Sequence, residues 1–154
     1  MIRMSKQTDY GILLLTEFAA DPAGLTLSAR ELSARSGLPL PMVSKILKVL
    51  TRGDLLASHR GARGGYRLAR RPDLITVADV IGALDGPFAM TECLDAPGDC
   101  RQESTCPVRN NWQLINQTVH KALDAITLWD MTRPLSPPLI PLQGMKPRRP
   151  ARVA

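Results

Sequence analysis

The chain has 154 residues, enough for one compact domain with a hydrophobic core and one extension. No apolar run reaches the roughly 18–20 residues of a membrane span, and the first residues lack the features of a signal peptide, so we expect a cytoplasmic protein. The formal net charge of +6 is unevenly distributed and favours a polyanionic partner over a membrane or a small-molecule substrate.

Basic and acidic residues are separated along the sequence. Residues 28–71, the basic block, contain ten Lys and Arg and two acidic residues, whereas residues 73–103 contain seven acidic residues and one Arg. A basic block beside an acidic segment indicates that one face of the protein meets a polyanion and that another face has a different role.

The first part of the chain predicts two helices and a turn. Residues 6–20 are predicted to be a helix, with apolar side chains at helical spacing at Tyr10, Leu13, Leu14 and Phe18. Ser28 and Glu31 form a capping-box pattern that begins a short helix ending at Ser36, and Gly37 supplies the turn.

A third helix and a hairpin follow. The helix is predicted from Pro41, whose fixed φ suits a first helical position, to about Arg52. Strands over residues 55–59 and 66–68 are joined by a turn with three glycines. This order is that of a winged helix-turn-helix, in which a helix enters the major groove of duplex DNA and a basic hairpin grips phosphates or the minor groove.

The predicted DNA contacts lie on the exposed face of the third helix and on the hairpin. They are Pro41, Met42, Ser44, Lys45, Lys48, His59, Arg60, Arg63 and Arg67. The alternative is a solvated helix face beside a hairpin that only connects two strands. The combination of capping box, turn, helix, glycine hairpin and local charge favours DNA.

The second half of the chain predicts a helix, a loop and a long helix. Thr76 and Asp79 cap a helix that ends near Gly86, and residues 92–107 are irregular. A helix over about 108–131 carries an apolar stripe with a period near 3.5 residues, made of Trp112, Ile115, Val119, Leu123 or Ala122, Ile126 and Trp129. The Pro-rich, basic tail is predicted to be disordered.

The predicted fold is therefore mostly α with a small β-hairpin wing. We divide it into a winged helix-turn-helix DNA-binding domain (1–88), a cysteine loop (89–107), a dimerisation helix (108–132) and the tail (133–154).

Cys93, Cys100 and Cys106 lie in this polar loop with six and then five residues between them. An odd number of cysteines fits a disulfide framework poorly. Thiolates bind zinc, cuprous copper or iron–sulfur clusters, and the Cys-x2-Cys spacing typical of structural zinc is missing. The spacing favours metal binding, while reactive redox thiols and inert thiols are the alternatives.

Over residues 3–132 the chain resembles the Rrf-type family of winged-helix iron–sulfur transcription regulators, to which IscR-like and NsrR-like members belong. The resemblance is carried by residues 8–11, 36–38, 60–68, 77–84 and 126–128 and by the three cysteines. It implies a homodimer joined by long C-terminal helices, with an iron–sulfur cluster on the cysteines that alters affinity for operator DNA. It also implies that Ser44 and Lys45 read bases and that Arg60 is a wing contact.

The chain departs from the resemblance at the fourth cluster ligand. IscR-like members have a His three residues after the last cysteine, where this chain has Arg109, which does not ligate. NsrR-like members use an acidic residue near the start of the partner's first helix, the position of Asp9 here; the alternative is that Asp9 only stabilises its helix dipole. Asp95, Asp99 and Glu103 are further candidates, so [2Fe–2S] is favoured slightly and [4Fe–4S] stays open.

We expect an iron–sulfur-dependent repressor of iron–sulfur assembly genes, because the resemblance is strongest to Suf-type regulators. A repressor that senses nitric oxide or redox state is the alternative within the family. Two alternatives from other classes of protein are a small iron–sulfur electron carrier and a zinc-stabilised interaction module. The sequence has no nucleophile–base arrangement that would indicate an enzyme, and His59 is read as a phosphate contact.

Overall fold

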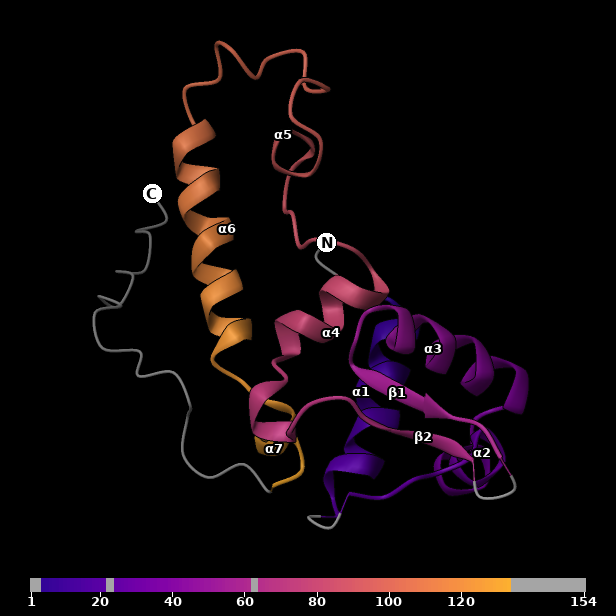
Figure 1. Cartoon of the computed structure of the whole chain (residues 1–154). Coiled ribbons are helices and arrows are strands. Elements are labelled where there is room, and N and C mark those ends of the chain that lie inside the picture. Colours follow the sequence, from indigo (N-terminus) through magenta and orange to yellow (C-terminus); the bar gives the residue numbers. More distant parts are fainter. Residues whose placement is uncertain (1–3, 22–23, 62–63, 134–154) are drawn as a thin grey trace, which may run out of the picture.

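The computed structural model describes residues 4–21, 24–61 and 64–133, so the predicted contact Arg63 and the predicted disordered tail beyond residue 133 lie outside the described residues. The elements in chain order (Figure 1) are α1 Lys6–Ala19, α2 Ala29–Ser36, α3 Leu40–Arg52, β1 Leu56–His59, β2 Gly65–Leu68, the 3-10 helix η1 Pro72–Leu74, α4 Val77–Leu84, α5 Glu92–Asp95, α6 Arg109–Asp124 and α7 Leu128–Met131. This mostly helical chain with one antiparallel hairpin confirms the predicted fold class. Within these ranges no helix is long and apolar enough to cross a membrane.

Local caps begin and end the helices of the winged-helix part. Ser28 accepts from the backbone N–H of Glu31 at 3.3 Å, and the Glu31 carboxylate accepts from the N–H of Ser28 at 2.7 Å, which is the predicted capping box. Gly37 ends α2 with φ of 70°, a left-handed conformation that favours glycine. Two orphan N–H groups are thus satisfied and the chain turns sharply into α3.

α3 begins one residue before the predicted start. Pro39 is its N-cap, Leu40 is the first helical residue and Pro41 the second. Proline tolerates this position because the first four N–H groups of a helix have no intrahelical acceptor.

The hairpin pairs β1 with β2 in antiparallel register, from Leu56 opposite Leu68 to His59 opposite Gly65. Leu27 extends this sheet through an antiparallel bridge to Tyr66. A Cβ at Gly65 would lie 2.7 Å from the carbonyl oxygen of Leu27, so the close approach of these two backbones requires glycine.

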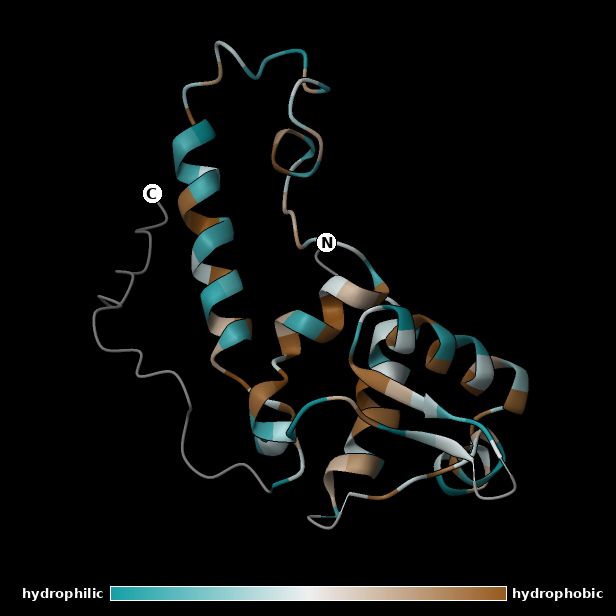
Figure 2. Ribbon diagram, viewed as in Figure 1, coloured by the Kyte–Doolittle hydropathy of each residue, from teal (hydrophilic) through white to brown (hydrophobic). Residues whose placement is uncertain are grey.

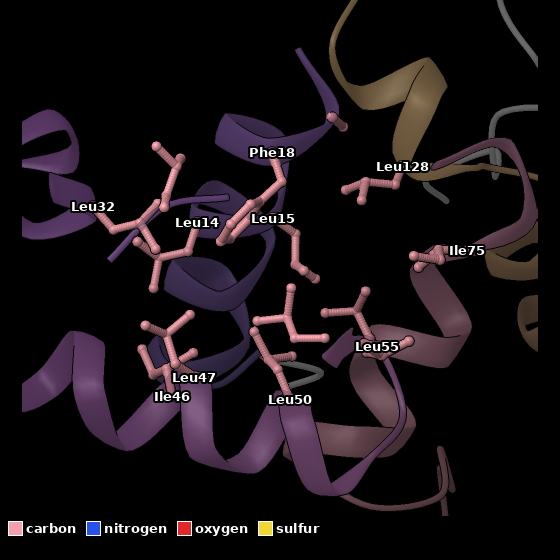
Figure 3. Packing of buried hydrophobic residues seen from close by; sticks show 14 of the residues in the cluster. Leu14, Leu15, Phe18, Leu32, Ile46, Leu47, Leu50, Leu55, Ile75 and Leu128 are labelled. Atoms are coloured by element: carbon pink, nitrogen blue, oxygen red, sulfur yellow. The ribbon is translucent and has the colours of Figure 1, made fainter. Parts of the chain in front are cut away.

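One apolar core joins α1, α2, α3, the hairpin and α7. Figure 3 shows side chains from these elements, and from the segments just before β1 and α4, converging, among them Leu14, Leu15, Phe18, Leu32, Ile46, Leu47, Leu50, Leu55, Ile75 and Leu128. The predicted apolar face of α1 was wrong at one position, because Leu13 is 43% exposed whereas Leu15 is fully buried. α1 contacts α2, α3, α4 and α7, and this set of neighbours selects Leu15 over Leu13.

The predicted helix over 108–131 is interrupted. α6 ends at Asp124, and α7 starts afresh at Leu128 behind its own capping box of Thr127 and Asp130. Between them the backbone turns toward the segment before α4: Val77 N–H donates to Ile126 O at 2.9 Å, and Leu128 N–H donates to Ile75 O at 2.7 Å. Burial of Leu128 in the core outweighs continuation of an exposed helix, so Ile126 and Trp129 do not extend the α6 stripe.

The capping box of α7 makes stability depend on pH. Hydrogen bonds from the Thr127 hydroxyl and then from its backbone N–H lower the pKa of Asp130 below its ordinary value of 3.8. A carboxyl with a depressed pKa in the folded state contributes stability above its unfolded pKa, and that contribution is lost as pH falls through the folded pKa.

We therefore expect Asp130→Asn to lower the free energy of unfolding more near pH 6 than near pH 3, measured by urea unfolding. Asp95→Asn serves as the control, since the Asp95 carboxylate makes no hydrogen bond or ion pair within the described ranges. An equal effect of Asp130→Asn at both pH values would contradict this role of the cap.

Candidate nucleic-acid interface and cysteine loop

α3 presents one face to the core and one to solvent. Its core face is made of the fully buried Val43, Ile46, Leu47 and Leu50. The predicted contacts Pro41, Met42, Lys45 and Lys48 are exposed, and Ser44 is half-buried. The packing of α3 against α1, α2, α4 and β1 therefore leaves short and basic side chains on the outward face.

On the hairpin, the predicted contacts His59, Arg60 and Arg67 are exposed. His59 ends β1, Arg60 follows it, and Arg67 lies on β2 opposite Ala57. Leu56 is buried on the core side of the sheet. The strand alternation thus anchors the hairpin in the core and turns its basic side chains to solvent.

The cations of the basic block divide into paired and unpaired groups. Arg70 pairs with Asp79 at 3.4 Å, and Arg71 pairs with Asp73 at 2.6 Å. In the part of the chain that the structure describes, the ion pairs involve none of Lys45, Lys48, Arg60 and Arg67. Among the described residues of the basic block, the cations without an acidic partner include those on α3 and the hairpin, where phosphate is the fitting counter-charge.

The cysteine loop leaves the end of α4, includes α5 and returns into α6, as the upper arch of Figure 1 shows. The sequence predicted no helix there; α5 is a single short one. Cys93 is buried within it, with its sulfur 3.4 Å from Thr91 Oγ1. Cys100 and Cys106 are half-buried, and all three thiols are free.

Three free thiols in a polar segment fit an iron–sulfur cluster in donor chemistry. Among residues 4–21, 24–61 and 64–133, however, no group of three or more His, Cys, Asp or Glu is placed to hold a metal ion. One protomer therefore does not by itself gather the cysteines into a ligand set. Asp9 lies exposed in the first turn of α1 and belongs to no such group either.

Near Cys100, Glu103 and Arg109 form an ion pair. The Glu103 carboxylate accepts from Arg109 Nη2 at 2.8 Å and from the backbone N–H of Gly98 at 2.6 Å. Arg109, the residue at which this chain lacks the His of IscR-like members, thus neutralises one of the candidate carboxylates.

α6 exposes large apolar side chains in its first half. Trp112 is 37% exposed, Leu114 65% and Ile115 42%. In Figure 2, α6 carries brown, hydrophobic segments among teal ones and stands apart from α1, α2 and α3. Large exposed apolar residues on one element are typical of a surface that packs against a partner.

The sequence over residues 4–134 matches the family model of Rrf2, described as iron-dependent transcriptional regulators. The chain belongs to the Rrf2 family. It is a DNA-binding transcriptional regulator, and because members of the family are not enzymes, the prediction of a non-enzymatic function is confirmed.

Relatives and solved structures extend over nearly the whole described chain. Protein rrf2 of Nitratidesulfovibrio vulgaris is 27% identical over 135 residues, which cover 88% of this chain and 90% of that protein. CymR of B. subtilis, the global cysteine regulator, superposes with a TM-score of 0.67 at 30% identity, covering 86% of this chain and 97% of that one. IscR of T. potens superposes with a TM-score of 0.64 at 28% identity, covering 84% of this chain and 85% of that one. The Rrf2 chain thus shares its fold with both regulators.

One residue of interest was missed by the sequence analysis. Asn116 of α6 hydrogen-bonds to the backbone at the start of the cysteine loop. A single Asn within an amphipathic helix carries no sequence signal for such a contact.

Proposed function

We propose that this Rrf2 regulator is a homodimer that binds operator DNA and represses iron–sulfur assembly genes according to the state of an iron–sulfur cluster in its cysteine loop. The observation that carries the DNA part is the set of cations on α3 and the hairpin that lack an acidic partner among the described residues. Neutralising phosphates with such cations releases counterions and drives binding.

In the proposed complex, α3 lies in the major groove. Ser44 and Lys45 contact base edges, and Lys48 contacts phosphate together with His59, Arg60 and Arg67 of the hairpin. Pro41 and Met42 add contacts at the start of α3, and Arg63, which lies outside the described residues, is a further proposed DNA contact. A half-site spacing of about 34–36 Å requires two copies of this unit held rigidly.

The proposed dimer interface is α6. The exposed Trp112 and Ile115, three positions apart on one face of α6, support it, because burying them against a second α6 removes apolar surface from water. In this scheme residues 1–88 bind DNA, residues 89–107 hold the cluster and residues 108–132 dimerise, with Leu128 also completing the core of the DNA-binding part.

The proposed cluster ligands are Cys93, Cys100 and Cys106, with Asp9 of the partner subunit as the fourth. Arg109 is unsuited to ligation, and its ion pair with Glu103 favours an acid from elsewhere. When bound, the cluster would supply a redox-active group whose loss frees the thiols. As the type of cluster, [2Fe–2S] is favoured slightly over [4Fe–4S].

A second candidate is a repressor of the same family that senses redox state through its thiols without a cluster. Two observations favour it: a single protomer does not gather the thiols, and the structure is similar to that of CymR, named as a cysteine regulator. In that case the thiols themselves would respond to the oxidant.

Anaerobic purification and reconstitution with iron and sulfide test the proposal. The loaded protein should absorb in the visible range, and losing the cluster should change operator affinity about tenfold, measured by fluorescence anisotropy. The matched control replaces all three cysteines with Ser and should show neither effect. A colourless protein whose DNA affinity responds to oxidant alone would favour the second candidate, and a coloured protein without DNA affinity would indicate an electron carrier.

A further inference from the structure

The cysteine loop is tied to α6 by one side chain. Asn116 Oδ1 accepts from the backbone N–H of Met90 at 3.1 Å, and Asn116 Nδ2 donates to the carbonyl oxygen of Phe88 at 3.3 Å. The residues joined are 26 and 28 positions apart in the sequence. A primary amide suits this task because it donates and accepts at once without carrying charge.

The remaining hydrogen bonds of residues 87–107 in the described structure are local. The Glu103 bonds to Gly98 and Arg109 span five and six positions. The backbone bonds of the loop, such as Leu94 N–H to Thr91 O at 3.0 Å, span three or four. Among the described residues, the long-range hydrogen bonds of residues 87–107 are therefore those to Asn116 of α6.

The residues that Asn116 contacts lie next to the turn that contains Cys93, the first of the three cysteines. Thr91 follows the tethered Met90, and its carbonyl accepts from the N–H groups of Leu94 and Asp95 at 3.0 and 3.1 Å. That turn carries the buried Cys93, whose sulfur lies 3.4 Å from Thr91 Oγ1. Cys100 and Cys106 lie beyond α5, outside this chain of contacts.

We propose that Asn116 is a positioning residue: its amide fixes the Cys93 end of the cysteine loop on α6 and carries rearrangements of the loop into that helix. The positioning role stands on the contacts above, whereas the transmission role rests on the proposed function of the loop. The two roles call for separate measurements.

The first measurement uses the full-length, reduced, metal-free protein and follows alkylation of each cysteine by iodoacetamide with mass spectrometry. Asn116→Ala should speed the reaction of Cys93 about tenfold, because burial of that thiol depends on a turn that the tether holds, and should leave Cys100 and Cys106 unchanged. The matched control is Gln117→Ala, an exposed neighbour on α6 without a hydrogen-bonded side chain among the described residues.

Asn116→Asp gives a second, near-isosteric test. The carboxylate still accepts from Met90 N–H but no longer donates to Phe88 O, so Cys93 should again react faster than in the wild type. An unchanged Cys93 rate in both variants would overturn the positioning role. Equal acceleration of all three thiols with a lower melting temperature would also overturn it, since Asn116 would then only support general stability.

The second measurement compares operator affinity with and without the reconstituted cluster. Asn116→Ala should retain the visible spectrum of the wild type but show a cluster-dependent change in affinity about fivefold smaller. A variant that responds as strongly as the wild type would overturn transmission. If wild-type affinity ignores the cluster, transmission falls together with the proposed function, while the alkylation result still decides the positioning role.

Discussion

Replacing Lys45 and Lys48 with Ala is expected to weaken binding to operator duplex about 10- to 100-fold near physiological salt. Both ammonium groups are exposed on the outward face of α3 and have no acidic partner in the described structure, so DNA phosphates and base edges are their counterparts. The helix itself should persist, because its core face is untouched and Ala is a strong helix former. Fluorescence anisotropy over a range of salt concentrations measures the affinity.

The salt dependence separates a local contact from a general charge effect. Each lost phosphate contact reduces the steepness of log affinity against log salt by about 0.9, so the double variant should lose about 0.9 through Lys48, the proposed phosphate contact of the two. A matched control removes the same charge at Lys6 of α1 and Lys121 of α6, both exposed. Equal losses in the two double variants, or an unchanged slope after Lys45 and Lys48 are replaced, would contradict the assignment of α3 as the recognition helix.

Leu128→Ala is expected to lower the free energy of unfolding by about 2–5 kcal/mol, the range for large-to-small changes in a packed core. Leu128 is 2% exposed and packs in the same core as α1 and Ile75, while its backbone N–H donates to the Ile75 carbonyl at 2.7 Å. The truncation leaves a cavity where the chain returns from α6. Urea unfolding followed by circular dichroism measures the loss.

Met131 provides the matched control on the same helix. It is 45% exposed, so Met131→Ala should change stability by less than about 1 kcal/mol. Similar losses in the two variants would show that α7 is not anchored through Leu128. Loss of this anchor should also loosen the junction between α6 and the DNA-binding part, because Val77 and Ile126 are joined next to it.

Much of the DNA-binding part could be predicted from the sequence, because its signals are local. A Ser-x-x-Glu capping box, a glycine in the left-handed region after α2 and a glycine-rich basic hairpin each depend on residues only a few positions apart. The apolar face of α3 follows from helical periodicity, because Val43, Ile46, Leu47 and Leu50 recur at that spacing and all are buried.

The cysteine loop could be read only for its chemistry. Three thiols in a polar segment indicate a soft-metal or redox site, whichever way the loop folds. The places of Cys93, Cys100 and Cys106, and the pairing of Glu103 with Arg109, depend on how the backbone turns between them. The Asn116 tether joins residues more than 25 positions apart, and no spacing rule reaches that far.

The sequence alone determined the winged-helix order, the family and the residue types available for DNA and sulfur chemistry, because each follows from short-range patterns. Only the tertiary structure decided that α6 ends at Asp124, that burial of Leu128 is favoured over a longer α6, and that Arg70 pairs with Asp79 while Lys45 and Lys48 have no acidic partner among the described residues. Burial and ion pairing are properties of groups that meet across the fold, so their free energies are set by neighbours distant in the chain.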